Sequence, residues 1–522
     1  MKQKNLIIIL ALATATVFAN IGGLDIYALD EAKNAEAARE MYISGDFITP
    51  YYNGEIRTDK PPLHYYFMSV GYSLFGVNAF GARFMNALFG VLTVLLVFLF
   101  AQKHFNERVA LFSSLVLITS LHFNMQMHMS VPDPYLIFFL TWAFFSFYNA
   151  YKENKWQQKL AFYFAIGCGL LLKGPIAVGL TGLTAVLFLF INKDFKWKTI
   201  WRLQPFGGLL LSLAVAVPWY WAVHQATDSY WTNEFFFKHN FSRFSDSMEG
   251  HNGIFLLTFA YALLLGMLSY IPFVAQSFKA AFKGSETLKY LLCGASVIIL
   301  FFAVSSTKLP NYTTPSYPLL ALMIGHLLAH IDNRFFERKA NMIGYYLYGV
   351  LMIALPVGIY FGLKADQSIS HLATLWVYFI PAALLGGYWI YIGISKSSLS
   401  NAILANMATW VITILLFFNL AFPQVDAENP TRKLIPQMDN ESPVISYSRL
   451  NPAFVFEMQR IIPRYDTIEN IEAFIEENPK GFIISRAKYR AELESIEDVI
   501  FVDQARDTFE NPTSLLMYWE RD

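Results

Sequence analysis

The sequence predicts a mainly α-helical membrane protein with about thirteen transmembrane helices and a small C-terminal α/β domain. Of its 522 residues, 55% are hydrophobic and only 15% are charged, which is more apolar surface than a soluble core of this size needs. Apolar runs recur through residues 1–424, whereas residues 425–522 hold 11 Lys plus Arg against 19 Asp plus Glu. We therefore expect a membrane domain followed by a water-soluble one.

Each apolar run of about 20 residues can cross roughly 30 Å of hydrocarbon as a helix. The expected spans lie near 5–24, 79–101, 108–124, 131–151, 159–172, 174–192, 204–224, 253–275, 289–305, 312–330, 342–363, 373–395 and 402–422. The fifth run is short enough to be re-entrant.

Basic residues in the short loops predict the orientation, because Lys and Arg collect on the cytoplasmic side. Lys2 and Lys4 lie on the same side of the membrane as the basic loops. We therefore expect a bacterial-type inner-membrane protein with its amino terminus in the cytoplasm. An odd number of spans then makes residues 25–78 and 425–522 periplasmic. Alternatively, the first apolar run is a signal peptide cut near Ala19, which leaves the orientation of the rest unchanged.

The first outer loop, residues 25–78, is expected to carry interfacial helices. Asp30 can cap a helix over residues 31–42 that ends at Gly45, and residues 63–75 are rich in Tyr and Phe. In the C-terminal domain, short apolar runs alternate with a helical pattern over residues 468–477, which predicts a small α/β unit. These runs are 444–445, 481–484, 499–502 and 515–519.

Several classes of function are disfavoured. The nearest approach to a phosphate-binding glycine loop, residues 167–174, lacks the second glycine before Lys173 and the Ser or Thr after it. We therefore expect neither a nucleotide nor a nucleic acid as a partner. Cys168 and Cys293 both fall inside expected spans, which leaves no disulfide framework and no thiolate metal site.

Polar side chains gather instead at the outer ends of spans and in the outer loops. An unpaired charge removed from water costs several kcal/mol or more, roughly, so such groups usually have a partner or a task. Several loops that supply acids and cations to one face are the usual way in which a bundle builds a site. The candidates are Asp30, Glu31, Lys33, Arg39, Arg57, Asp59, Lys60, Asp133, Lys173, His239, Arg243, Lys308 and Tyr312.

These residues also have structural interpretations. A helix N-cap explains Asp30 and Asp133, and a lysine that reaches toward the headgroups explains Lys60, although two prolines after it hold it on a stiff turn. A plain amphipathic loop explains His239 and Arg243, and a proline-broken loop explains Lys308 and Tyr312.

A set of short motifs runs in order through about the first 330 residues. They are Asp30-Glu31, Ala37-Ala38-Arg39-Glu40-Met41, Gly45-Asp46-Phe47, Lys60-Pro61-Pro62-Leu63, Gly81-Ala82-Arg83, Lys173-Gly174-Pro175, Pro218-Trp219-Tyr220, the pair His239 and Arg243, and Lys308-Leu309-Pro310 with Tyr312 and Pro315. Together they resemble the polytopic GT-C glycosyltransferases, particularly the lipid A aminoarabinose transferases and, more distantly, the protein O-mannosyltransferases.

This resemblance implies a glycosyltransferase that uses a polyprenyl-phosphate sugar. Asp30 would be the essential acid, and the sugar phosphate would be held by Lys60, Arg243, Lys308 and Tyr312. A divalent metal ion, Zn or Mg, would lie between Asp59 and His239, and it is the one cofactor implied. We count Asp30 and Lys60 as catalytic, and as substrate-binding Glu31, Lys33, Arg57, Asp133, Lys173, Arg243, Lys308 and Tyr312.

Two departures from the family pattern leave the donor sugar and the acceptor open. Asp59 stands where an aminoarabinose transferase has Glu, and Lys33-Asn34 stand where the family has Arg and Tyr. The acceptor is therefore lipid A, another glycolipid or a protein. A lipid-borne donor would enter sideways between the membrane helices.

The expected chemistry is one displacement with inversion. Negative charge builds on the departing phosphate, and fixed cations such as Lys60, Arg243 and Lys308 stabilise it. If the acceptor is a hydroxyl, Asp30 serves as general base, whereas with a phosphate acceptor Asp30 orients groups or balances charge.

Two other functions compete with this one. A secondary transporter or lipid flippase also needs many spans, but transporters usually place ionisable residues near mid-membrane and show related halves. In a third interpretation the C-terminal domain carries the function and the helices only anchor it to the membrane, although an anchor requires far fewer spans.

Overall fold

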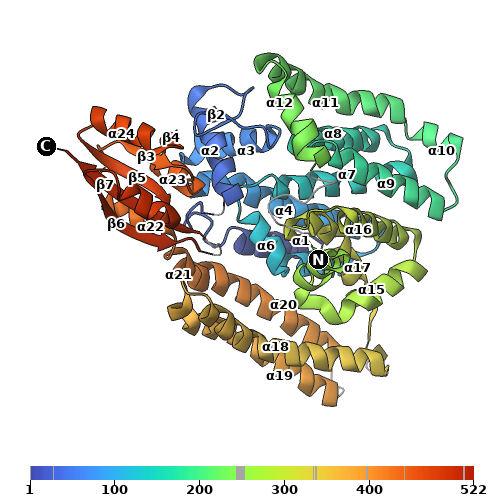
Figure 1. Ribbon diagram of the computed structural model, residues 1–522. Coiled ribbons are helices and arrows are strands. Elements are labelled where there is room, and N and C mark those ends of the chain that lie inside the picture. The colour runs from blue at the N-terminus through green and yellow to red at the C-terminus, as the bar shows by residue number, and fades with distance from the viewer. Residues whose placement is uncertain are drawn as a thin grey trace.

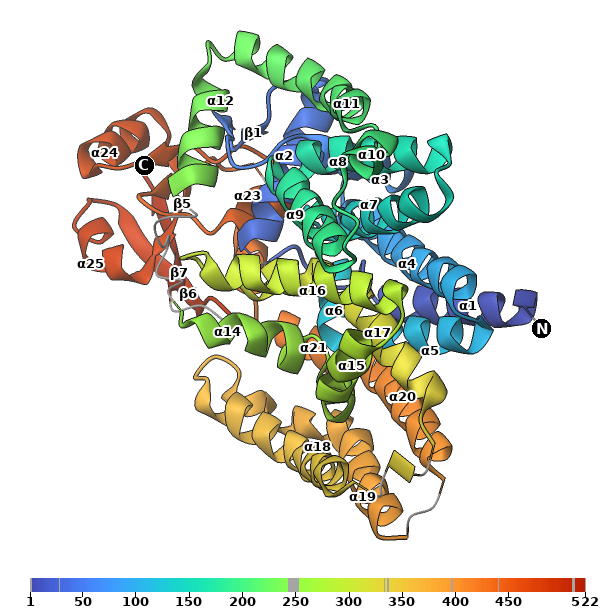
Figure 2. The same ribbon diagram turned by 90° about the vertical axis from the view of Figure 1, so that its right-hand side faces the viewer.

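In the computed structural model a bundle of helices carries a small sheet domain at one end, beside the first long loop (Figures 1 and 2). The structure describes residues 2–27, 29–242, 253–332, 334–335, 338–395, 398–439, 441–508 and 512–521. The first elements are α1 (Lys2–Val17), α2 (Leu29–Ser44), β1 (Tyr51–Tyr52), β2 (Glu55–Ile56), α3 (Leu63–Phe75), α4 (Ala79–His104), α5 (Glu107–Ile118), α6 (Leu121–Met127), α7 (Asp133–Glu153), α8 (Trp156–Lys173) and α9 (Ile176–Ile191).

The rest of the bundle follows in chain order. Its elements are α10 (Trp197–Arg202), α11 (Pro205–Ala226), α12 (Tyr230–Asn233), η1 (Glu234–Ser242), α14 (Phe255–Phe259), η2 (Ala260–Leu265), η3 (Leu268–Tyr270), α15 (Ile271–Lys283), α16 (Glu286–Val304), η4 (Pro310–Ser316), α17 (Tyr317–His330), α18 (Lys339–Ala365), η6 (Ser370–Phe379), α19 (Ile380–Ser395), α20 (Leu399–Leu416), η7 (Phe417–Ala421) and α21 (Phe422–Asp426).

Every stretch expected to be a span contains helix. By length and composition, the described residues include six helices able to cross a membrane: Ala79–His104, Trp197–Ala226, Glu286–Val304, Asn341–Ala365, Ser370–Ser395 and Leu399–Asp426. Two bent pairs, Glu107–Ile118 with Leu121–Met127 and Phe255–Leu265 with Leu268–Lys283, raise this to eight. Gln3–Val17 and Ile176–Ile191 are shorter apolar helices. A multi-pass helical fold is confirmed, while the number thirteen stays a prediction.

The first loop contains both expected helices. The earlier one, α2, begins at Leu29, so Asp30 lies in its first turn rather than before it, and Gly45 follows the helix with φ 73°. Between α2 and α3, Asn53 and Gly54 adopt positive φ values of 53° and 77° and join β1 to β2, as Asn-Gly pairs do in tight hairpins. Arg57 directly follows the second strand of this hairpin.

The C-terminal domain is the expected α/β unit. Its elements are α22 (Pro430–Leu434), η8 (Ile435–Gln437), β3 (Val444–Tyr447), α23 (Pro452–Met458), β4 (Arg464–Tyr465), α24 (Ile468–Glu477), β5 (Lys480–Arg486), η9 (Ala487–Tyr489), α25 (Arg490–Leu493), β6 (Val499–Arg506) and β7 (Thr513–Glu520). The strand order is β4-β3-β5-β7-β6, with β3 parallel to β4 and β5 and the other pairs antiparallel.

Strand alternation divides the core of this domain into two layers. Ile445, Ile483 and Met517 pack with α24 and α25, whereas Val444 and Ile484 pack with α22 and α23 on the other face. The second layer turns α23 toward the membrane domain, where Ala453 and Phe456 join the apolar cluster of α2 and α3. Figure 1 shows this contact between α23 and α2 at the end of the bundle.

Candidate functional site

Asp30 lies at the start of α2, where the helix N-terminus favours a negative charge. Its side chain is 56% exposed, and its Oδ1 lies 3.8 Å from Nη2 of Arg57. Its backbone carbonyl accepts a hydrogen bond of 2.7 Å from the Asn34 amide, one turn further along. The carboxylate is therefore open to a ligand on one side and held by protein on the other.

Arg57 is the buried partner of two carboxylates. Its Nη1 lies 3.1 Å from Oδ2 of Asp59, and its Nε donates to the Tyr65 hydroxyl at 3.1 Å. The indole of Trp231 donates to the backbone carbonyl of Arg57 at 2.8 Å and so ties the hairpin to α12. Asp30 and Asp59 are thus linked through one guanidinium.

The local charges keep Asp30 ionised. Surrounding protein by itself raises the pKa of Asp30, but the positive charges of Lys60, Arg57 and Lys173 outweigh that effect and lower the pKa below 3.8. Burial, together with the charges of Arg57 and Lys60, lowers the pKa of His64 well below its usual 6.5, so this imidazole is neutral.

A second ion pair lies beside this group. Lys173, the last residue of α8, donates to Asp133 in the first turn of α7 at 2.8 Å. The Lys173 ammonium also lies 5.7 Å from the centre of the Tyr312 ring on η4. Because Lys173 contributes to the lowered pKa of Asp30, the two pairs belong to one electrostatic cluster.

The structure therefore brings together seven of the predicted site residues, from α2, the hairpin exit, α7, α8 and η4. They are Asp30, Arg57, Asp59, Lys60, Asp133, Lys173 and Tyr312. The side chains of four others, namely Glu31, Lys33, Arg39 and Lys308, are not part of this cluster, and those of His239 and Arg243 lie outside the described residues.

Glu31 has a partner of its own. It forms a two-pronged ion pair with Arg83 of α4, with distances of 2.7 and 3.0 Å, and it also accepts from the backbone of Ser130 at 2.8 Å. Arg83 further donates to the carbonyls of Ile21 and Leu24. This buried pair therefore holds the segment between α1 and α2 in place.

Among the residues that the structure describes, neither Lys308 nor Lys33 makes a side-chain contact with the cluster. The Lys308 ammonium donates to the carbonyls of Phe302, Ala303 and Ser305 and so satisfies the C-terminal end of α16. Burial lowers its pKa. Lys33 is partly buried on α2, directly before Asn34.

Of the two expected metal ligands, Asp59 and His239, the structure describes only the side chain of Asp59. His239 lies in the π-helix η1, but its side chain is outside the described residues, and so is all of Arg243. Among the described residues, no three or more His, Cys, Asp or Glu side chains are grouped to hold a metal ion. Asp59 directs a carboxylate oxygen at Arg57 instead.

Sequence reasoning assigned no role to several residues of the site. Asn34 Oδ1 faces Arg57 Nη2 at 3.4 Å, His64 Nε2 at 3.3 Å and the Tyr65 hydroxyl at 3.5 Å. Arg83 was noted only as part of a motif. The signal that identifies it is a charged residue within the first turns of an apolar span, where charges usually have a structural or functional partner.

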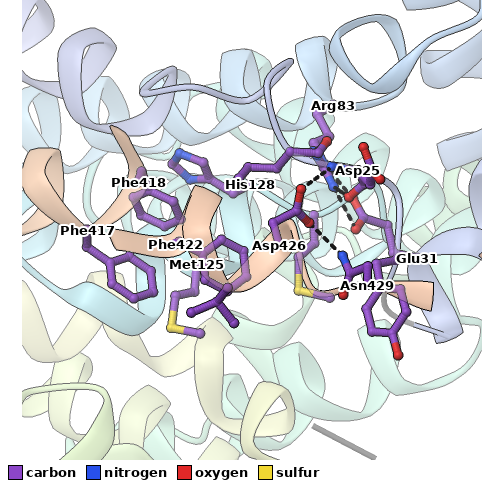
Figure 3. Close-up of a pocket in the computed structure, with 14 residues that line it drawn as sticks. Asp25, Glu31, Arg83, Met125, His128, Phe417, Phe418, Phe422, Asp426 and Asn429 are labelled. Carbon is purple, nitrogen blue, oxygen red and sulfur yellow. Dashed lines mark hydrogen bonds and ion pairs between the residues drawn. The ribbon is translucent and has the colours of Figure 1, made fainter. Parts of the chain in front are cut away.

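A hollow of about 650 Å³, including the part open to solvent, lies next to the pair of Glu31 and Arg83. Figure 3 shows it lined on one side by Phe417, Phe418, Phe422 and Met125, and on the other by ionic and amide groups. The latter are Asp25, Glu31, Arg83, Asp426 and Asn429. His128 stacks on Phe418, with ring centres 3.5 Å apart.

Comparison with known protein families gives one match. The family described as dolichyl-phosphate-mannose-protein mannosyltransferase matches residues 59–221, which include Asp59, Lys60, Asp133 and Lys173.

Two similar proteins are named undecaprenyl phosphate-alpha-4-amino-4-deoxy-L-arabinose arabinosyl transferase. That of Shewanella sediminis is 28% identical over 82% of this chain and 78% of its own length. That of Yersinia pestis is 30% identical over 65% of this chain and 62% of its own length. Both names describe enzymes, which favours catalysis over the transporter interpretation.

Solved structures show the same fold. ArnT of Cupriavidus metallidurans, bound to undecaprenyl phosphate, superposes with a TM-score of 0.78 at 19% identity and covers 98% of this chain and 97% of its own. The oligosaccharyltransferase of Archaeoglobus fulgidus gives a TM-score of 0.53 at 12% identity, over 94% of this chain and 70% of its own.

Proposed function

We propose, for this polytopic GT-C glycosyltransferase of the aminoarabinose-transferase and protein-mannosyltransferase type, that it transfers a sugar from undecaprenyl phosphate to a glycolipid such as lipid A. The observation that carries the proposal is the cluster of Asp30 and Lys60 from the first loop with Lys173 at the end of α8. It presents positive charge around one exposed carboxylate, as transfer from a phosphate leaving group requires.

The charges divide the chemistry between two tasks. Lys60 and Lys173 lower the energy of the phosphate that departs with the polyprenyl chain, because negative charge grows there in the transition state. Asp30 has a lowered pKa and is therefore a weak proton acceptor. This favours an acceptor that is already anionic, such as a glycolipid phosphate, with Asp30 orienting the reactants in one inverting displacement.

We also propose the topology that this chemistry needs. Thirteen spans, with the amino terminus in the cytoplasm, place Asp30 and the C-terminal domain at the periplasmic face of the bacterial inner membrane. Tyr312, beside Lys173, would help to hold the donor phosphate together with Arg243, and Lys308 would have to release the carbonyls of α16 to join them.

The substitution Asp30→Asn tests the function. In proteoliposomes that contain lipid A and undecaprenyl-phosphate aminoarabinose, we expect it to lower transfer by roughly 100-fold or more, measured by mass spectrometry of the lipid A. Glu55→Gln, an exposed residue of β2 in the same loop, is the matched control and should keep full activity. An Asp30→Asn protein that folds and transfers at the normal rate contradicts the assignment.

A further inference from the structure

The side chain of Arg57 is only 4% exposed, yet it faces two carboxylates that belong to different parts of the first loop. Nη2 lies 3.8 Å from Asp30 on α2, and Nη1 lies 3.1 Å from Asp59 before the Pro61-Pro62 turn. A buried guanidinium is stabilised only by such partners, and each carboxylate is stabilised by it in turn.

The guanidinium is held in this place by neutral groups on two helices. Nε donates to the Tyr65 hydroxyl at 3.1 Å, and Nη2 faces Asn34 Oδ1 at 3.4 Å. The Asn34 amide is itself oriented, because its Nδ2 donates to the Asp30 carbonyl at 2.7 Å. Each nitrogen of the Arg57 guanidinium therefore faces an acceptor, and the positive charge has a fixed position between Asp30 and Asp59.

A divalent cation at Asp59 would meet this charge. Asp59 Oδ2 already faces Nη1 of Arg57, so an incoming ion would have to displace this ion pair and then lie next to a buried guanidinium that has lost one of its two carboxylate partners. Arg57 cannot lose its proton to relieve that repulsion. Among the described residues, the groups around Asp59 do not suit a divalent metal ion while Arg57 stays in place.

We propose that Arg57 is a built-in counter-ion that takes the place of a divalent metal ion between Asp30 and Asp59, so that this chain transfers sugar without a metal. Arg57 acts as a positioning residue, since it fixes the two carboxylates and leaves the exposed side of Asp30 for substrate. The role in transfer rests on the proposed function, whereas the absence of metal binding does not.

The test begins with metal binding and does not depend on activity. Wild-type protein, purified in detergent, treated with chelator and returned to buffer, is titrated with ZnCl₂ and with MgCl₂ by calorimetry, and metal content is measured by mass spectrometry. We expect no saturable binding. The substitution Arg57→Gln removes the positive charge between Asp30 and Asp59 and should create a site for one divalent ion, because no guanidinium then stands between the two carboxylates.

Two variants separate this effect from general damage. Arg57→Lys keeps a charge without the fork, so it should bind no metal and should transfer more slowly than wild type. Arg39→Gln removes another buried arginine, paired with Glu36 on the same helix α2, and should create no metal site at Asp59. Thermal melting of each variant shows whether it is folded.

The results decide between the alternatives. One equivalent of Zn or Mg on the wild-type protein, or wild-type transfer abolished by chelation and restored by metal, overturns the inference but leaves the glycosyltransferase proposal standing. A folded Arg57→Gln protein that binds no metal overturns it as well. If the wild-type protein binds no metal and transfers no sugar in the assay, the proposed function fails and the counter-ion assignment stands.

Discussion

Asp30 and Glu31 are neighbours in the chain, yet they have different tasks. Adjacent side chains on a helix point about 100° apart, so the phase of α2 decides which carboxylate meets Arg57 and which meets Arg83. Asp30 remains open at the site, whereas Glu31 is buried at the base of the loop.

The lowered pKa of Asp30 predicts the acid limb of the activity. A carboxylate with a lowered pKa stays ionised until the pH falls through that pKa, so kcat/KM should stay level from pH 8 down to about 5. Lys60→Met removes the charge that lowers this pKa most, and it should move the acid limb to higher pH as well as slow transfer. A limb at the same pH in both proteins argues that Lys60 does not act on Asp30.

The pair of Glu31 and Arg83 should matter for folding. Arg83→Met leaves a buried carboxylate without its partner, which costs about 3–5 kcal/mol, and thermal melting in detergent should fall accordingly. The double variant with Glu31→Gln should recover part of the loss. Asp466→Asn, which breaks an exposed pair with Arg464, is the control and should change stability by less than about 1 kcal/mol.

For single residues, the sequence indicated which charged side chains belong to the candidate site, but it said less about which partner each of them contacts. Charges at span ends identified Asp30, Arg57, Asp59, Lys60, Asp133 and Lys173 as one face, and the structure brings these together. It could not show that Lys308 folds back on the carbonyls of α16, because that contact depends on how the chain bends after Val304.

The helices α3 and α4 approach each other closely, because glycines stand at their contact. A Cβ at Gly71 would collide with the carbonyl oxygen of Gly81, so the two backbones touch without side chains between them. This contact fixes α3, which carries His64 and Tyr65 toward Arg57.

Gly71→Ala should therefore destabilise the protein by about 1–3 kcal/mol through overpacking, with a lower melting temperature and reduced transfer. Gly179→Ala on α9 is the matched control, since nothing lies within 4 Å of its added Cβ, and a better helix former there should keep or raise stability. Equal melting of wild type and Gly71→Ala would show that the contact is loose.

The elements themselves follow from the sequence to a large extent. Apolar runs predicted the two helices of the first loop and four strands of the C-terminal domain close to their observed positions, whereas the hairpin of β1 and β2 and the short strand β4 were not predicted. The bends of 67° after Ile118 and 73° after Leu265 were not predicted, although Thr119-Ser120 stand at the first break and a π-helical turn followed by Gly266 at the second, which are local features that kink helices.

Across the whole molecule, the C-terminal domain is fastened to the first loop. Asn53, in the hairpin turn, donates to the Ile462 carbonyl at 2.9 Å and accepts from the Ile462 amide at 2.8 Å. Arg432 holds Asp25 at 2.8 Å, and Glu457 accepts from the Ile26 amide at 3.2 Å. Composition separated the two domains, but it carries no information about where they meet.

Glu457 makes this attachment sensitive to pH. Burial, followed by the charge of Asp25, raises the pKa of Glu457 from 4.5 to about 7. The folded state then binds a proton that the unfolded chain has lost, so stability should fall as the pH rises from about 4.5 to 7 and stay lower above it. Glu457→Gln keeps the acceptor but cannot titrate, so it should remove most of this fall, measured as melting temperature at pH 5 and pH 8. A wild-type curve no steeper than that of the variant rejects the role.

These attachments join residues about four hundred positions apart, and this has a consequence for how the enzyme is made. The segment that carries Asp30 leaves the ribosome before most of the membrane helices, but its partners are synthesised only after them. A chain that stops shortly before Arg432 would contain the described membrane helices and still lack all of these contacts, so the first loop completes its packing only after the membrane domain has been made.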